Sequence, residues 1–307
     1  MGKEDGFRDL RIVDNFYQTS AFFPMPTVLA GTVAENGMTN LGSYSLCFPY
    51  YIAGKDYYAM LLECRNSSNT AQNILRNKKV SLNFIPDDRK YFREAVRLGF
   101  PGDTTEEKMK NCLFTLSPSK IDGSRPKIVQ EAFQVFECTW DDSLENAFED
   151  KAGNLEGYEP PYRSFNGITS KWGAHFILKI DKIWMKGKYY DTIINGVKAG
   201  GFPSVPVDYG YRDSTNFWYS RFRRPIAEKI RAKEGDVNSV IYAAERIDPE
   251  VKFTREACGK LTKIPRVFLK AALTQMVEIA KQEGITLIDE KSLTVINDKR
   301  REEKKKK

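Results

Sequence analysis

One short run of the chain combines a fixed cation with hydroxyl and amide side chains. It reads Cys64, Arg65, Asn66, Ser67, Ser68, Asn69 and Thr70. The apolar residues that follow have helical spacing, and the free N–H groups and positive dipole at a helix start suit a phosphate. An arginine beside them would add a charge-assisted bond. The run therefore predicts an anion site, although an ordinary capped helix after a strand explains the same spacing.

A second run mixes small, polar and aromatic residues. It reads Thr39, Asn40, Leu41, Gly42, Ser43, Tyr44, Ser45 and Leu46. The glycine and the two serines would let a flat ring approach the backbone, whose amides could bond the carbonyl and nitrogen edges of that ring. The run predicts a surface for a planar ligand, and a polar strand edge is the alternative.

Other chemistries have few residues to draw on. The single histidine, His175, disfavours a histidine-rich metal site and a hydrolase triad, and no metal is expected. The five cysteines are odd in number and contain no C-x-x-C pair, which argues against a disulfide framework and zinc knuckles. Neither G-x-G-x-x-G nor G-x-x-x-x-G-K-S/T occurs, so another geometry must hold any bound nucleotide.

The elements that would position the two runs are mostly strands. An apolar run from Phe22 predicts a strand, and Asn36-Gly37 predicts a tight hairpin turn after it. Residues 70–77 predict a helix, and residues 80–84 and 175–184 alternate as strands do. The part of the chain up to about residue 185 therefore has β-barrel character.

The remaining segments complete the expected organisation. Residues 104–112 are expected to be helical, and residues 127–138 to form a pair of strands. From Ile264 the apolar residues recur at helical spacing, and Gly284 predicts the end of that amphipathic helix. We expect three parts, namely a first domain over 1–235, a small helical domain over 236–298 and a disordered basic tail over 299–307.

Composition and charge exclude several classes of protein. The 307 residues suit about two domains, and the tail 299–307 carries +5 of the net charge of +7, which leaves +2 for the rest. A nearly neutral body argues against a nucleic-acid partner. We find neither an apolar run of about 18 residues nor the apolar segment of a secretory signal, so no membrane contact and a cytoplasmic location are expected.

Residues 22–85 resemble the flavin reductase-like, FMN-binding split-barrel family (flavoredoxin-like). The resemblance rests on four elements in matching order and spacing: residues 24–33, 37–45 and 70–74, then Asn83 in the following strand. It continues more weakly through His175 to about Pro225, and so covers roughly the first two thirds of the chain.

The resemblance implies a fold class that is mainly β with α, a split β-barrel that binds FMN. It also implies a homodimer with FMN near the subunit interface and NAD(P)H as hydride donor. By position, Asn40 to Leu46 would line the isoalloxazine ring, and Cys64 to Thr70 would bind the cofactor, with Arg65 to Thr70 at its phosphate.

The family's histidine near the nicotinamide falls at His175, which becomes the candidate catalytic residue. Here the residues that follow are Phe-Ile-Leu-Lys-Ile-Asp, where the family typically has a Gly-Glu pair further along the strand. From the residues alone, a lone histidine on a strand is equally a structural residue.

The C-terminal part is similar to another known module. Residues 253–257, 261–268 and 278–286 resemble the small helical C-terminal domain of the B subunit of light-independent protochlorophyllide reductase. The resemblance implies a compact helical appendage that can sit beside a redox protein partner or a substrate.

We therefore expect an FMN-dependent oxidoreductase that passes hydride or electrons from reduced nicotinamide to an acceptor such as a metal chelate or another flavoprotein. The isoalloxazine would carry the redox chemistry, which explains why no acid–base pair stands out in the sequence. The alternative is a non-enzymatic FMN-binding electron carrier or flavin sensor with a partner-docking helical module.

Overall fold

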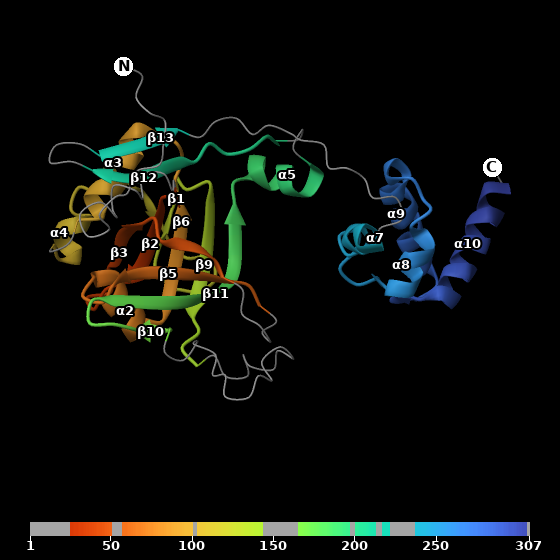
Figure 1. The fold of residues 1–307 in the computed structure, drawn as a ribbon, viewed down its shortest axis with the longest axis horizontal. Helices are drawn as coiled ribbons and strands as arrows, with labels where there is room; N and C mark the ends of the chain where they lie inside the picture. The colour runs from red at the N-terminus through yellow and green to blue at the C-terminus, as the bar shows by residue number, and fades with distance from the viewer. Residues whose placement is uncertain are drawn as a thin grey trace, which may run out of the picture. The chain divides into compact units, whose positions relative to one another are not determined.

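The computed structural model describes residues 25–50, 57–100, 103–143, 165–196, 200–212, 217–221 and 237–305. The chain divides into two compact units, Met1–Pro225 and Ile226–Lys307. Figure 1 shows that the first is built mainly from strands and the second mainly from helices. The domain boundary expected near residue 235 and the strand start expected at Phe22 lie outside the described residues.

An eight-stranded antiparallel sheet organises the first unit. Its order is β3-β2-β6-β9-β11-β5-β4, with β10 paired to β11 outside that path. The strands are β2 Val28–Val33, β3 Thr39–Tyr44, β4 Cys47–Tyr50, β5 Ala59–Arg65, β6 Lys79–Phe84, β9 Gln134–Trp140, β10 Gly167–Ile168 and β11 Gly173–Met185. The sheet curls (Figure 1), and within the described residues β3 and β4 form its two open edges. The predicted class, a mainly β split barrel with a helical C-terminal part, is confirmed.

Strands β2 and β3 form the hairpin predicted at Asn36-Gly37. Gly37 has a φ of +80°, a conformation that glycine adopts without a steric penalty. The turn is closed by the Asn36 side chain, whose Oδ1 accepts a bond of 3.0 Å from the backbone N–H of Met38. Val33 then pairs with Thr39 and starts the ladder.

Strand β11 pairs with two different strands, β5 and β9, because it bends. Residues 173–179 pair with β5 and residues 178–185 pair with β9, with a register shift between Ile180 and Lys182. An irregularity of this kind increases local twist and redirects a strand. The bend is visible in the long green strand of Figure 1.

Four helices of the described residues accompany the sheet of the first unit. They are α2 Asn69–Asn77, α3 Arg89–Leu98, α4 Thr105–Met109 and α5 Gly187–Asn195. The helix predicted over 70–77 is thus confirmed as α2, and α4 lies within the predicted 104–112. Helix α3 has no counterpart among the sequence predictions.

Alternate residues of the strands face two different cores, as the period of two requires. On β2, Val28 and Ala30 belong to a core that α2 closes through Ile74. Leu29 belongs to a second core, which α3 covers through Leu98. Both helices are therefore fixed directly against the strands that they accompany.

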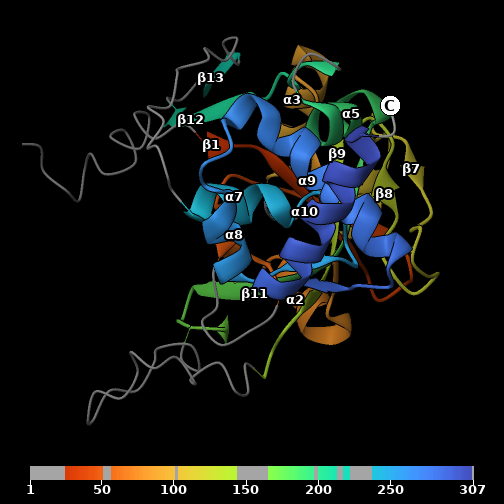
Figure 2. The same ribbon diagram turned by 90° about the vertical axis from the view of Figure 1, so that its right-hand side faces the viewer.

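Two small sheets complete this unit. Strand β7 Leu116–Ser117 pairs with β8 Ile128–Val129, and β12 Pro206–Arg212 lies between β1 Met25–Pro26 and β13 Phe217–Arg221. Residues 127–138, predicted to form a pair of strands, contain β8 and the start of β9, but these two do not pair with each other. Strand β8 pairs with β7, and β9 pairs with β6 and β11. Figures 1 and 2 both show β13 close to α3, where the rings of Phe92 and Tyr219 stack at 4.2 Å.

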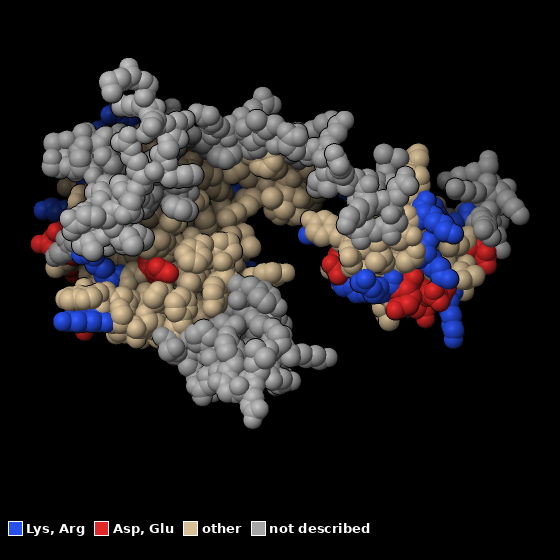
Figure 3. Space-filling model, in the orientation of Figure 1, with Lys and Arg blue, Asp and Glu red and all other residues tan. Residues whose placement is uncertain are grey.

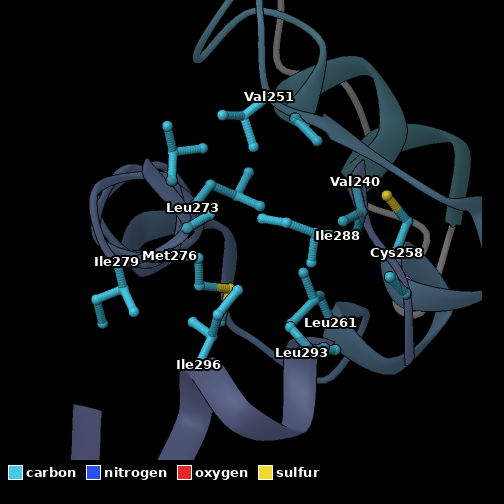
Figure 4. Packing of buried hydrophobic residues seen from close by; sticks show 14 of the residues in the cluster. Val240, Val251, Cys258, Leu261, Leu273, Met276, Ile279, Ile288, Leu293 and Ile296 are labelled. Atoms are coloured by element: carbon cyan, nitrogen blue, oxygen red, sulfur yellow. The ribbon is translucent and has the colours of Figure 1, made fainter. Parts of the chain in front are cut away.

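The second unit is a small helical bundle with its own core. It contains α7 Val237–Ala244, α8 Arg255–Leu261, α9 Arg266–Gln282 and α10 Glu290–Lys305, with a parallel pair of β14 Lys252–Phe253 and β15 Leu287–Ile288. Figure 4 shows Met276 of α9 turned toward Ile296 of α10, and Leu273 and Leu293 belong to the same core. The predicted amphipathic helix is α9, and Gly284, with a φ of +70°, follows its end as expected.

Helix α10 continues to Lys305, so residues 299–305, predicted as part of a disordered tail, are helical. Lysine, arginine and glutamate are good helix formers. The helix is also tied to the preceding segment, because Lys299 pairs with Glu283 and Nε of Arg300 donates to Oε1 of Gln275 at 2.9 Å. On the face seen in Figure 3, acidic and basic side chains of this unit lie side by side. Within the described part of the chain, none of the helices has the length and apolar character that crossing a bilayer requires.

Candidate functional site

Two adjoining cavities lie where β3, β5 and the start of α2 meet. They have volumes of about 400 and 380 Å³ and share Ser43, Tyr44 and Arg65 in their walls. The first, here called the histidine cavity, is also lined by Ser45, Leu46, Glu63, Cys64 and residues 172–175. The second, here called the anion cavity, is also lined by Gly42, Ser67 to Thr70, Leu98 to Phe100, Asp103 and Lys108. Together they reach the size of a small-molecule site, roughly 300–1,000 Å³.

The anion cavity receives the N-terminus of α2. Ser68 caps this helix, and its Oγ accepts a bond of 3.1 Å from the N–H of Ala71. Asn69 and Thr70, the first residues of α2, line the cavity, and the free N–H groups and positive dipole end of a helix start suit an anion. The exposed Arg65 side chain makes no hydrogen bond or ion pair with any residue that the structure describes. Its guanidinium is available to a ligand.

The wall of the anion cavity is closely packed around Gly42. A Cβ at this position would lie 2.6 Å from Oγ1 of Thr70 and 2.9 Å from Cε2 of Tyr44. Contacts below about 3 Å are not tolerated without movement, so only glycine lets the Thr70 and Tyr44 side chains lie this close to position 42.

Tyr44 and Cys64 are both held in their protonated forms. Burial raises the pKa of Tyr44 to about 12; Cys64 adds to the rise, and hydrogen bonds with Thr70 and Ser68 oppose it. Burial likewise raises the pKa of Cys64 to about 12, helped by Glu63 and opposed by a hydrogen bond with Ser68. The cavity wall therefore offers a phenol and a thiol at neutral pH, and no thiolate nucleophile.

His175 is held by side chains on both ring nitrogens. Nδ1 lies 2.5 Å from Oγ1 of Thr169, and Nε2 lies 3.5 Å from Oε1 of Glu63, the residue opposite His175 in the β5–β11 register. The ring also stacks on Phe165, with 4.3 Å between the centroids. The His175 side chain is 22% exposed and lines the histidine cavity, so a ligand there can reach a histidine whose orientation is fixed.

The turn before α2 is tied to the loop between β10 and β11. The Asn66 backbone N–H donates to the carbonyl of Trp172 at 3.2 Å, and Nδ2 of Asn66 donates to that of Lys171 at 2.8 Å. Gly173 pairs with Arg65 in the ladder. The side chain of Trp172 is 73% exposed and lines the histidine cavity. The β5–β11 pair thus runs from the histidine cavity to Arg65, which lines both cavities.

The structure brings most of the sequence-predicted residues to these cavities. Gly42 to Leu46, Cys64, Arg65, Ser67 to Thr70 and His175 line one or both of them. Asn40, Leu41 and Asn66 do not. Leu41 packs into the core under α3, and Asn66 makes the loop contacts described above.

Asn40 is fully buried beside the cavity. Its Oδ1 accepts bonds from Thr105 at 3.3 Å and from Asn69 at 3.5 Å, whereas its Nδ2 has no partner. Asn40 thus connects β3 to the starts of α2 and α4. It supports residues that line the anion cavity and does not line the cavity itself.

Several cavity residues were not predicted from the sequence, among them Glu63, Trp172, Phe100 and Lys108. Glu63 and Trp172 become visible only through the register of β5 and β11, although the position of His175 on an alternating strand gives a partial signal. Phe100 and Lys108 come from the polar region after β6, where the sequence shows no distinctive motif. Among the described residues, no cluster of three or more His, Cys, Asp or Glu is arranged to hold a metal ion.

Solved structures of similar fold include a nitroreductase, a monooxygenase component and a flavoredoxin. They are 2-nitrobenzoate 2-nitroreductase from Pseudomonas fluorescens (16% identity, 72% of this chain and 92% of that chain, TM-score 0.49), nitrilotriacetate monooxygenase component B from Bacillus cereus (13%, 74% and 100%, 0.49) and flavoredoxin from Methanosarcina acetivorans (15%, 75% and 97%, 0.44). No protein-family model and no curated protein matches the chain. At these identities and TM-scores the likeness assigns no residue a role, so the roles proposed below rest on the cavities and their side chains.

Proposed function

We propose that the chain binds FMN and passes hydride or electrons from reduced nicotinamide through it to an acceptor. One observation carries the proposal: two joined cavities offer an anion-binding end and a histidine-bearing end, connected through Ser43, Tyr44 and Arg65. A flavin mononucleotide has the matching polarity, with a phosphate at one end and a planar ring at the other.

The donor set of the anion cavity fits a phosphate. Arg65, the hydroxyls of Ser67 and Thr70 and the N-terminus of α2 line it together. A guanidinium and helix N–H groups are strong partners of phosphate oxygens. Arg65 would bind the phosphate, and Ser43 and Tyr44, which line both cavities, would lie along the ribityl chain.

The histidine cavity fits the ring end. Ser43 to Leu46 would lie along the isoalloxazine, and the protonated Tyr44 and Cys64 add no negative charge at this wall. Bound flavin would supply the hydride and electron chemistry. His175, held by Thr169 and Glu63, would orient the nicotinamide beside the flavin.

A homodimer is part of the proposal. Among the described residues strand β4 is an open edge, and Phe48 within it and Leu46 just before it are exposed large apolar residues. Unpaired strand edges favour association with a second chain. A dimer formed at this edge would cover the histidine cavity, because Leu46 also lines it.

The first experiment is a titration of the purified protein with FMN, followed by the visible spectrum and flavin fluorescence. Arg65→Ala removes a charge-assisted bond worth about 1.5–3 kcal/mol, so FMN affinity should fall roughly 10- to 150-fold. Arg93→Ala is the matched control, because Arg93 is exposed on α3 and lines neither cavity. Equal affinities in the two variants would refute the assignment of Arg65 to the phosphate.

A second experiment separates an enzyme from a carrier. The FMN-loaded protein is mixed with NADH or NADPH, and oxidation of the nicotinamide is followed with and without an added acceptor. Turnover supports an oxidoreductase. FMN binding without nicotinamide oxidation would favour the alternative, a flavin carrier or sensor whose helical unit docks a redox protein partner.

A further inference from the structure

Lys108 is a buried ammonium group in the wall of the anion cavity. The residue lies on α4 and is only 8% exposed. Its Nζ donates one long bond, of 3.4 Å, to the carbonyl oxygen of Leu98. Within the described part of the chain, no carboxylate oxygen lies close enough to form an ion pair with it. Lys108 therefore keeps donor capacity that the protein itself does not use.

The position of Lys108 is built by the surrounding structure. Nη2 of Arg97 donates to the backbone carbonyl of Lys108 at 2.9 Å, and Arg97 is itself paired with the buried Glu94. A capping box between Thr104 and Glu107 fixes the start of α4. The ammonium is thus held at the cavity by a defined network.

The charges around Lys108 favour an anionic ligand. Burial lowers the pKa of Lys108, Arg97 lowers it further, and Asp103 raises it. A buried ammonium without a counter-ion is unfavourable, and an anion placed beside it offsets that cost. Arg65 and Lys108 outweigh the single carboxylate of Asp103 in this cavity, and the N-terminus of α2 adds to their field.

We propose that Lys108 is a second cation for the ligand phosphate and that it makes this cavity selective for a phosphate monoester. The proposal rests on the flavin function proposed above. A monoester carries close to two charges at neutral pH, whereas each phosphate of a dinucleotide carries one. Two cations in one small cavity therefore favour FMN over FAD, and over riboflavin, which has no phosphate.

The test compares the affinities of three ligands, FMN, riboflavin and FAD, by quenching of flavin fluorescence. Lys108→Met keeps a flexible apolar stem in the buried position and removes the charge. Lys110→Met is the matched control, because Lys110 is exposed at the end of the same helix. In Lys108→Met, FMN affinity should fall at least 10-fold, riboflavin affinity should stay unchanged and the preference for FMN over FAD should shrink. Lys110→Met should change none of these.

The outcomes separate this inference from the proposed function. If the wild-type protein binds no flavin, both fail. If it binds FMN and Lys108→Met keeps the ratio of FMN to riboflavin affinity, the role of Lys108 is overturned and the flavin function stands. Equal losses for both ligands would assign Lys108 a structural role and also overturn the inference.

A measurement on the wild-type protein covers the case in which Lys108→Met does not fold. Reductive methylation of lysines is followed by mass spectrometry in the presence of FMN or of riboflavin. FMN should protect Lys108 and leave Lys110 reactive, and riboflavin should protect neither. Equal modification of Lys108 with both ligands would overturn the inference.

Discussion

The packing around Gly42 gives the sharpest prediction. Gly42→Ala places a methyl group 2.6 Å from Oγ1 of Thr70 and 2.9 Å from Cε2 of Tyr44. Overpacking of this kind costs about 1–3 kcal/mol. Alanine also restricts the unfolded chain more than glycine does, which offsets about 0.4–1 kcal/mol of that cost. From the middle of both ranges we expect the free energy of unfolding to fall by about 1.3 kcal/mol, and the melting temperature by about 3–5 °C.

The same substitution should act on ligand binding. Thr70 and Tyr44 both line the anion cavity, so their displacement moves a wall of the proposed site. FMN affinity is expected to fall at least tenfold, about 1.4 kcal/mol. Thermal unfolding and flavin titration of the same variant measure the two effects together.

Two further variants test whether the loss of stability arises from the contact between position 42 and Thr70. Gly123→Ala is the control, because a Cβ there meets nothing within 4 Å, and its stability should stay within about 0.5 kcal/mol of wild type. Thr70→Ala removes the nearest clashing atom, so the double variant with Gly42→Ala should recover part of the lost stability. A Gly42→Ala protein as stable as wild type, with unchanged FMN affinity, would show that the wall is not tightly packed.

Other predictions address the remaining parts of the molecule. His175→Ala should slow flavin reduction by NAD(P)H in stopped-flow measurements while FMN affinity stays constant; an unchanged rate would leave His175 a structural role. A chain that ends at Asp236 should still fold and bind FMN, since the first unit has its own cores, and an unfolded product by circular dichroism would contradict that division. Folding raises the pKa of Cys64 from 9.0 to about 12 and that of Tyr44 from 10.0 to about 12. The contribution of these protonated groups to the free energy of unfolding is complete below the pKa values of the unfolded chain. It is lost as the pH rises toward 12. Urea midpoints should therefore fall above about pH 9, less steeply in Cys64→Ala, and a midpoint independent of pH up to 11 would refute the burial of these groups.

Local signals in the sequence predicted the parts of the site that are continuous along the chain. The hairpin at Asn36-Gly37 and the capped helix α2 depend on turn chemistry and capping, which act over a few residues. Leu41, predicted to line the flavin ring, instead packs in the core under α3, because only the folded sheet shows which side of a strand has a cavity.

The burial of Lys108 beside the anion cavity depends on contacts distant in sequence. A lysine in a polar stretch normally predicts an exposed side chain. Its burial arises because α4 packs against β3 through Thr105 and Asn40, and because Arg97 of α3 binds the Lys108 carbonyl. Helix α4 spans only Thr105–Met109, too short for a hydrophobic period to reveal which side is buried.

The pairing of β5 with β11 limits where this chain can accept insertions and deletions. Glu63 and Arg65 lie two residues apart on β5, opposite His175 and Gly173 of β11. Removing or adding one residue in either strand would turn both pairs to the other face of the sheet, so the histidine end and the anion end would be lost together. Length variation among related chains should therefore concentrate outside these strands, and substitutions that tune one end of the site must leave their shared register intact.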